Sequence, residues 1–138
     1  MISIQEPLDL ISISLHRVLS FRKDEKYYNL VKDWNKTIII DIKEFYPVAV
    51  IFQGDDIRFE QGYDRKADLK VTMSIHTMLD IAFGRIGTIK AALLRKIKIK
   101  GMLKIGVILK FMKVFLKSMK MAANDPITDY VEFEKETR

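Results

Sequence analysis

The chain has 138 residues, 49% of them hydrophobic, with a net charge of +6 and no cysteine. This length favours one domain with its own core, and the hydrophobic fraction excludes a disordered chain. The absence of cysteine excludes disulfides, thiolate metal ligands and a cysteine nucleophile.

The first quarter of the chain predicts two helices and no targeting signal. Residues 1–10 carry two acidic residues and no basic one, whereas a signal peptide begins with positive charge. Apolar residues then recur at helical spacing from Leu8 to Leu19. Asp24 is placed to cap a second helix that ends near Trp34. We therefore expect a helical N-terminal part over residues 7–34 and a cytoplasmic protein.

Apolar and polar residues alternate in the next part of the chain, which is the pattern of strands with one buried face. Four such runs lie between residues 38 and 73, and we expect them to form a meander in which each strand pairs with the next. Ser74 should cap a helix that reaches Phe83. The alternation of Ile and Lys over residues 96–100 predicts a further strand that ends at Gly101.

The remaining segments complete an α+β architecture. Residues 88–94 predict a short helix, residues 103–122 the longest helix, and residues 123–138 a charged tail. A sheet with one apolar face must bury that face, and the helices are the only elements that can cover it. The prediction is a single domain with its core over residues 35–122, in which helices cover one face of a five-stranded, mainly antiparallel sheet.

The basic residues are concentrated in one third of the chain. Residues 85–120 hold eleven Lys and Arg and no acidic residue, while the rest holds 13 basic and 18 acidic residues, a net charge of −5. Such a segment should attract phosphate groups, either of nucleic acid or of an anionic membrane surface.

The predicted last helix is both basic and apolar. Lysines recur along it at spacings of three and four and form what we call the lysine stripe: Lys110, Lys113, Lys117 and Lys120. The stripe makes a membrane span too costly, at ~2.5–3.5 kcal/mol for a central lysine. Apolar residues occupy most of the remaining circumference of this helix, and this apolar surface is larger than one sheet can bury. The helix therefore either packs deeply in a core or against another chain, or it covers a lipid cavity and contacts a membrane surface.

Catalytic and metal-binding patterns are not found in the sequence. It has no phosphate loop, no nucleophile elbow and no HExxH motif. His16 and His76 are the only histidines and lie 60 positions apart, with no carboxylates at ligand spacing. Asp55 and Asp56 fit a turn better than a metal site. We expect no catalytic residue, no metal ion and no cofactor.

Three stretches resemble the sterol carrier protein (SCP2-like) lipid-binding domain. The first, Ala67-Asp68-Leu69-Lys70-Val71-Thr72-Met73-Ser74, resembles the strand of that family that leads into a helix. The second, residues 78–93, is similar to its two short helices around a glycine turn. The third, Lys96-Ile97-Lys98-Ile99-Lys100-Gly101, looks like its final strand, which ends in a Lys-Gly pair. The resemblance covers roughly residues 28–121 and implies an apolar tunnel between sheet and helices, with no catalytic residue.

The resemblance also implies which residues bind lipid. They are the inward strand positions and apolar helical positions of this sequence: Val50, Phe52, Phe59, Val71, Met73, Leu79, Ile81, Phe83, Ile89, Leu93, Ile97, Ile99, Ile105, Leu109 and Met112. The ligand would be a hydrophobic lipid of fatty acyl, sterol or isoprenoid type, bound or transferred without catalysis. The lysine stripe would dock the protein on anionic membrane, at ~1 kcal/mol per basic residue near the surface.

Two alternatives come from other functional classes. The basic segment 85–120 is also suited to nucleic acid, although Tyr and Trp, which stack on single-stranded bases, lie mostly outside it. The other alternative is a structural or accessory domain whose last helix packs on a second copy of the chain as a homodimer. Because the most apolar segment is also the most basic, the sequence favours a lipid at an anionic surface over nucleic acid.

Overall fold

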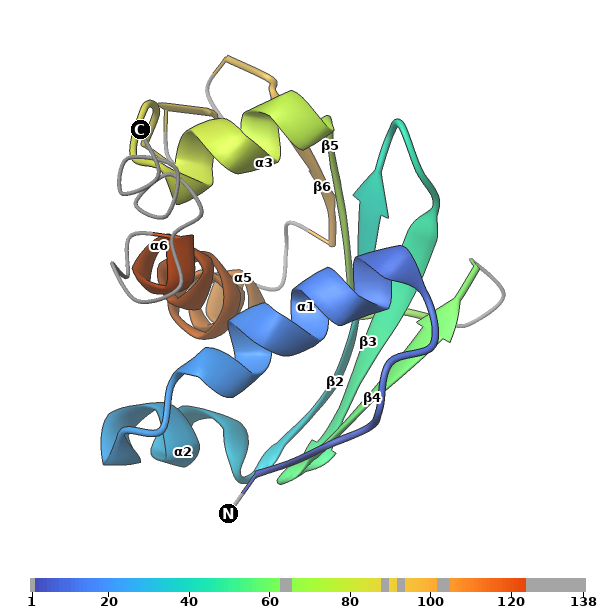
Figure 1. The fold of residues 1–138 in the computed structure, drawn as a ribbon, viewed down its shortest axis with the longest axis vertical. Coiled ribbons are helices and arrows are strands. Elements are labelled where there is room, and N and C mark those ends of the chain that lie inside the picture. The colour runs from blue at the N-terminus through green and yellow to red at the C-terminus, as the bar shows by residue number, and fades with distance from the viewer. Residues whose placement is uncertain (1, 63–65, 88–89, 92–93, 102–104, 124–138) are drawn as a thin grey trace, which may run out of the picture.

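The computed structural model describes residues 2–62, 66–87, 90–91, 94–101 and 105–123. Within these ranges a sheet forms one layer and the helices gather on one of its faces (Figure 1). The short helix expected over residues 88–94 and the tail beyond Ala123 lie largely outside the described residues.

The elements follow one another from a short first strand to a helical C-terminal segment. In chain order they are β1 (Ser3–Ile4), α1 (Leu10–Phe21), α2 (Glu25–Val31), β2 (Trp34–Ile42), β3 (Pro47–Gly54), β4 (Asp56–Gln61), β5 (Leu69–Met73), α3 (Ile75–Ala82), β6 (Ile97–Lys100), α5 (Ile105–Phe111), the π-helical segment η1 (Met112–Leu116) and α6 (Lys117–Ala123).

Both predicted helix caps are confirmed. The Asp24 carboxylate accepts a hydrogen bond from the backbone N–H of Tyr27 at 3.1 Å, and α2 follows. The Ser74 hydroxyl accepts one from the N–H of Thr77 at 3.0 Å, and α3 follows. However, α2 does not reach Trp34, because this residue begins β2 and its ring packs on the Phe52 ring at a centroid distance of 4.6 Å.

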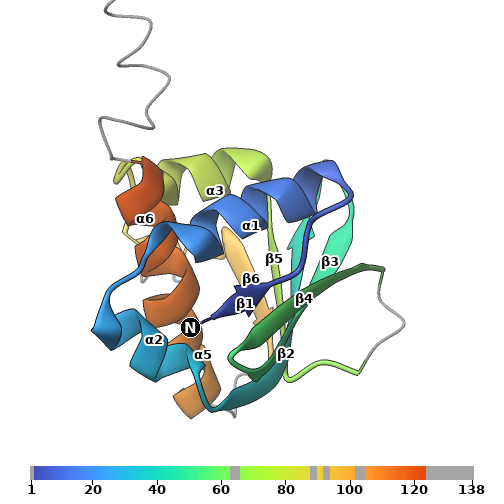
Figure 2. The ribbon, with the colours of Figure 1, turned by 60° about the horizontal axis from the view of Figure 1, so that its bottom comes forward.

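The sheet has six strands in the order β1-β4-β3-β2-β5-β6, not the five expected. The additional strand is β1, whose two residues pair in parallel with β4 at Ser3–Asp56 and Ile4–Ile57. A two-residue strand is too short to show alternation, so only its pairing partner defines it. Figure 2 brings the side of the molecule where the chain begins toward the viewer and shows β1 next to β4.

The expected meander is wrong at its fourth strand. Strand β5 pairs in parallel with β2, with Leu69 opposite Ile38, and does not pair with β4. Asp68 stabilises this arrangement, because its N–H donates to the Thr37 carbonyl at 2.8 Å and its carboxylate accepts from the Thr37 N–H at 2.9 Å. The β2–β3, β3–β4 and β5–β6 pairs are antiparallel, so the sheet is mainly antiparallel as expected.

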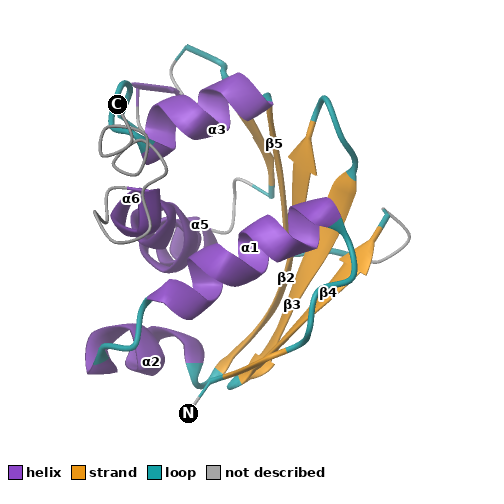
Figure 3. Cartoon of the chain, in the orientation of Figure 1, coloured by secondary structure: helices purple, strands orange, loops and turns teal. Residues whose placement is uncertain are grey.

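The core lies between the sheet and the helices, which stand on one side of the strands in Figure 3. Alternate strand residues such as Val50 and Val71 face the helices and are fully buried. The last helical segment contributes Phe111 and Phe115, whose rings stack at a centroid distance of 5.4 Å. No helix in the described part of the chain is long and apolar enough to cross a bilayer.

The C-terminal helical segment contains a π-helical turn, the segment η1, which we also call the π-turn. The sequence predicted one continuous helix over residues 103–122, whereas the structure describes α5, the five-residue π segment η1 and α6 from residue 105 to residue 123. Within η1, the carbonyl of Lys113 accepts a hydrogen bond from the Arg22 side chain at 3.3 Å. The π-turn is therefore in direct contact with the loop that joins α1 to α2.

Candidate functional site

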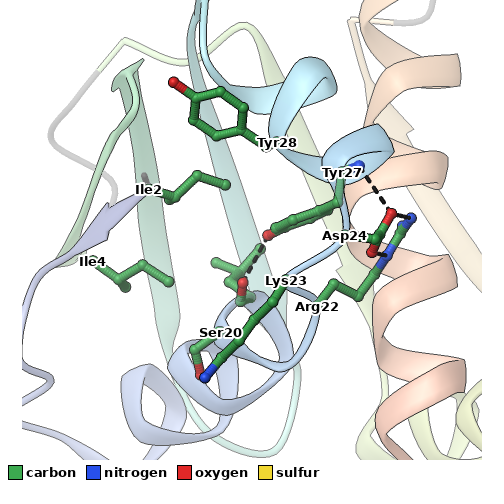
Figure 4. A pocket seen from close by; sticks show the side chains of 9 residues that line it. Ile2, Ile4, Ser20, Arg22, Lys23, Asp24, Tyr27 and Tyr28 are labelled. Carbon is green, nitrogen blue, oxygen red and sulfur yellow. Dashed lines mark hydrogen bonds and ion pairs between the residues drawn. The ribbon is translucent and has the colours of Figure 1, made fainter.

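A cavity of about 400 Å³ lies between β1, the C-terminal end of α1 and α2 (Figure 4). We call it the N-terminal pocket. Its volume falls within the ~300–1,000 Å³ of typical small-molecule sites. Its lining residues are Ile2, Ile4, Leu19, Ser20, Arg22, Lys23, Asp24, Tyr27 and Tyr28.

One wall of the N-terminal pocket is apolar. Ile2 and Ile4 form it and pack against the core, and they are held there because β1 pairs with β4. Leu19 and Tyr27 are buried behind the pocket. The Tyr27 hydroxyl donates a hydrogen bond to the Leu19 carbonyl at 2.8 Å, and burial raises the pKa of this hydroxyl, so it remains neutral. The side of the pocket that these four residues form is therefore apolar and uncharged.

Arg22 is buried at the edge of the same pocket, and each part of its guanidinium has a partner. Its Nε and Nη2 donate to the two carboxylate oxygens of Asp24 at 3.0 and 2.9 Å, and its Nη1 donates to the Lys113 carbonyl. The guanidinium also lies 5.0 Å from the centroid of the Tyr27 ring. Because this charge is neutralised within the protein, Arg22 positions the loop and is not the cation available to a ligand.

Lys23 provides a different kind of charge. It follows Arg22 in the loop, lines the N-terminal pocket and is exposed. Within the described residues it makes no ion pair. An apolar wall with an unpaired ammonium group at its rim suits a molecule with an apolar body and an anionic end.

The Arg22–Asp24 ion pair should make the stability of the protein depend on pH. The hydrogen bond from Arg22 lowers the pKa of Asp24 from 3.8 to about 2. Because the pKa is lower in the folded state, the contribution of Asp24 to stability is complete above pH ~4 and is lost as the pH falls toward 2. We expect the free energy of unfolding, measured by urea titration from pH 5 to pH 2, to fall less steeply in Asp24→Asn than in the wild type. The matched control Asp33→Asn, at an exposed turn position, should keep the wild-type slope, and an unchanged slope in Asp24→Asn would contradict the assignment.

Thirteen of the fifteen lipid-binding residues predicted from the sequence lie in the described part of the chain, and none of these thirteen lines the N-terminal pocket. Six of them lie in the packed core, namely Val50, Phe52, Val71, Met73, Ile81 and Ile97, and three are partly buried against it, namely Phe59, Ile99 and Met112. Four are 39–65% exposed, namely Leu79, Phe83, Ile105 and Leu109. Ile89 and Leu93 lie outside the described residues. The four exposed positions do not face the interior because neighbouring residues, Ile81 in α3 and Phe111 in α5, occupy the buried side of these helices.

A smaller cavity of about 240 Å³ does bring predicted residues together. We call it the lysine pocket. It lies between α3 and the η1–α6 segment and is lined by Ile81, Ile86, Gly87, Met112, Leu116, Lys117 and Lys120. The other half of the lysine stripe lies elsewhere, since the ammonium of Lys110 is 5.5 Å from the centroid of the Trp34 ring at the start of β2 and the Lys113 carbonyl contacts Arg22 in the α1–α2 loop.

Sequence reasoning missed the residues of the N-terminal pocket because no periodic pattern connects them. They come from β1, the last turn of α1 and the start of α2, which meet only in the fold. One local signal was available, because Arg22 and Lys23 immediately precede the capping residue Asp24 between two helices. Among the described residues, no cluster of three or more His, Asp or Glu side chains is arranged to hold a metal ion.

Comparison with known families decides the relationship of this fold. The model of the SCP-2 sterol transfer family matches residues 15–116, which is well over half of the chain. The chain belongs to the SCP-2 sterol transfer family. Binding and transfer of lipids is the general function of this family, and the match agrees with the resemblance found in the sequence. No curated protein sequence matches the chain.

Solved structures of other SCP-2 domains share the fold. A ubiquinone synthesis protein, UbiJ-SCP2, superposes with a TM-score of 0.60 at 14% identity, covering 84% of this chain and 90% of its own. Sterol carrier protein domain 2 of Helicoverpa armigera gives a TM-score of 0.60 at 16% identity, with coverages of 78% and 84%. Sterol carrier protein 2 from Yarrowia lipolytica in its apo form gives 0.56 at 18% identity, with coverages of 83% and 92%. At these identities the likeness shows the SCP-2 fold alone.

Proposed function

We propose that this SCP-2 domain binds and transfers, without catalysis, a fatty acyl lipid whose anionic head lies at Lys23. The observation that carries the proposal is the N-terminal pocket, which combines an apolar wall with an ammonium group that has no ion-pair partner among the described residues. Burial of each methylene contributes ~0.8 kcal/mol, so a long chain needs only one polar contact to be oriented.

The acyl chain is proposed to extend from the N-terminal pocket toward the core. Leu19 supports this direction, because it lines the pocket and belongs to the same hydrophobic cluster as Val50, Val71 and Met73, which were predicted as lining. These side chains are packed together in the structure, so ligand entry would require them to separate. In this proposal, the expected apolar tunnel forms only when the lipid enters and separates these side chains.

Docking on an anionic membrane is proposed as the second part of the function. Lys113, Lys117 and Lys120 are exposed, which supports a contact between the lysine stripe and lipid head groups. On the same helical segment, Ile105 is 65% exposed and Leu109 is 52% exposed. Exposed apolar side chains beside lysines are the combination found in helices that lie at a membrane interface.

Filling the N-terminal pocket should weaken acyl binding. Ser20 lines the pocket, so the indole of Ser20→Trp should occupy the space of the lipid and weaken a fluorescent acyl probe at least roughly tenfold, which corresponds to about two lost methylenes. The measurement is probe titration of delipidated protein. Ser14→Trp, on an exposed position of the same helix, is the matched control and should bind as the wild type does. Equal affinities of the two variants would show that the lipid binds elsewhere.

Lys23→Gln should distinguish an anionic lipid from a neutral one. We expect a fatty acid to bind roughly fivefold more weakly, because an exposed ion pair contributes up to ~1 kcal/mol, and a fatty alcohol of equal length to bind unchanged. Competition titrations with both ligands measure this difference, and Lys26→Gln on the exposed side of α2 is the control. The likeness to a ubiquinone synthesis protein makes an isoprenoid quinone the third ligand to titrate. If a sterol or the quinone binds and the fatty acid does not, the acyl assignment is wrong.

A further inference from the structure

The two walls of the N-terminal pocket are attached to the domain in different ways. On the α2 side, Tyr27 is fully buried and its hydroxyl donates a hydrogen bond to the Leu19 carbonyl. Arg22, on the same side, is hydrogen-bonded to a backbone carbonyl of η1. The opposite wall consists of Ile2 and Ile4, which belong to β1 and its start and are only partly buried (Figure 4). The α2 wall is therefore fixed to the core, and the β1 wall is the one that a ligand displaces more easily.

The β1 wall is part of a longer segment, residues 2–9, which we call the strap. It runs from β1, at the end of the sheet order, to the start of α1 (Figure 2). The hydrogen bonds that attach it beside β4 include those from the Ser3 N–H to the Asp55 carbonyl at 2.6 Å and from the Gln5 N–H to the Ile57 carbonyl at 2.8 Å. The Gln5 side chain also accepts one from the Phe59 N–H at 2.8 Å. Because β1 pairs with β4 over only two residues, it should open locally while the rest of the sheet stays intact.

The other end of the strap is fixed, and its middle is loosely packed. The Asp9 carboxylate caps α1 by accepting a hydrogen bond from the Ser12 N–H at 3.0 Å, and it also accepts one from the Tyr46 hydroxyl. In the middle of the strap, Glu6 is exposed and Leu8 is 93% exposed. A cavity of about 210 Å³ lies between this middle part and residues of α1 and β4, whereas protein interiors are normally close-packed. The strap is therefore able to turn about its fixed end at Asp9.

We infer that the strap is a lid over the N-terminal pocket: β1 separates from β4, the lipid enters between the strap and α2, and β1 then pairs again. This inference rests on the proposed function and specifies how the ligand reaches its site. Ile2 and Ile4 cover the acyl chain in the closed state, because they line the pocket and pack against the core. Since the strap is closed in the free and in the loaded protein, its opening limits entry and release alike, and the equilibrium affinity changes little.

A disulfide that locks the strap tests the inference, and the absence of native cysteine makes the pairing unambiguous. Ser3 and Asp56 are partners in the β1–β4 register, at the ~4.8 Å spacing of neighbouring strands that a disulfide spans, and neither lines the N-terminal pocket. In Ser3→Cys/Asp56→Cys, with oxidation confirmed by thiol titration, we expect the association rate of the fluorescent acyl probe in stopped-flow to fall at least roughly tenfold and to recover with reductant. The control Asn35→Cys/Gln53→Cys joins β2 to β3, which already pair at eight positions, and its oxidation should leave the rate unchanged. Equal rates for the oxidised and reduced strap variant would overturn the inference.

Loosening the strap should have the opposite kinetic effect. Gln5→Ala removes the side-chain acceptor of the Phe59 N–H, and Gln5 does not line the N-terminal pocket. We expect association and dissociation of the probe both to become roughly fivefold faster, with a nearly unchanged Kd. Gln53→Ala, the same chemical change at an exposed position of β3, should behave as the wild type does. Wild-type rates in Gln5→Ala at wild-type affinity would overturn the lid alone, whereas the affinity of Ser20→Trp tests the pocket itself, so the two failures are distinguishable.

Discussion

Replacing Arg22 by methionine is expected to lower the free energy of unfolding by about 2–3 kcal/mol, measured by urea denaturation at neutral pH. Arg22 is 7% exposed, and its guanidinium joins Asp24, the Lys113 carbonyl and the Tyr27 ring. Methionine fills part of the volume but donates no hydrogen bond, so the π-turn loses the side-chain donor to its Lys113 carbonyl. The Asp24 carboxylate is partly exposed and can be hydrated, which keeps the expected loss below that of a fully buried ion pair.

Two further variants define what Arg22 contributes. Arg17→Met removes an exposed arginine of α1, the helix that precedes Arg22, and should change stability by no more than ~0.5 kcal/mol. Arg22→Lys keeps the charge but lacks the forked geometry that reaches three acceptors, and its stability should fall between those of Arg22→Met and the wild type. If Arg22→Met costs as little as Arg17→Met, the contact between the α1–α2 loop and η1 does not stabilise the fold.

Gly101→Ala is expected to destabilise the protein by at least ~2 kcal/mol. Gly101 follows β6 and has φ = +97°, a backbone conformation that residues other than glycine rarely adopt. An added Cβ would also lie 2.5 Å from the Asp68 carbonyl oxygen and 3.1 Å from Leu69 Cδ2. The Asp68 backbone cannot shift easily, since the N–H of Asp68 donates a hydrogen bond to the Thr37 carbonyl of β2. Thermal and urea unfolding measure the loss.

Gly106→Ala is the matched control for this substitution. Gly106 lies in α5, and an added Cβ would meet no atom of the described residues within 4 Å. Because alanine is the better helix former by about 0.5–1 kcal/mol, this variant should be slightly more stable than the wild type. If Gly101→Ala lowers the free energy of unfolding and Gly106→Ala raises it, the loss at Gly101 comes from its close approach to Asp68 and not from the replacement of a glycine as such. Two losses of similar size would contradict this explanation.

Local patterns predicted most of the elements correctly. The caps at Asp24 and Ser74 and the strand that ends at Gly101 each depend on a few consecutive residues, which interact in the same way in almost any fold. Alternation also predicted which residues of β2 and β5 face the helical core, as Ile38 and Val71 show. The resemblance to the SCP2-like family arose from the same short stretches, and the family match over residues 15–116 confirms it.

Strand partners and the candidate site were beyond the reach of these patterns. The alternation of β5 is equally compatible with β4 and with β2 as its neighbour, and hydrogen bonds between Asp68 and Thr37 accompany the pairing with β2. The sequence around Ile4 shows no strand pattern, and only its pairing with Ile57 in the structure identifies it as part of a strand. Lipid-lining positions taken from sequence were apolar residues in general, and such residues fill a core as readily as they line a cavity.

By itself, the sequence determined the α+β class, the SCP-2 relationship and the basic, apolar character of the last helix, because these depend on composition and on contacts between residues close in the chain. The tertiary structure decided the sixth strand, the parallel neighbour of β5, the π-turn and the position of both pockets. These features depend on segments far apart in the chain. Lys23 lines a pocket with Ile4, and Lys117 lines another with Ile81, only because packing brings these segments together.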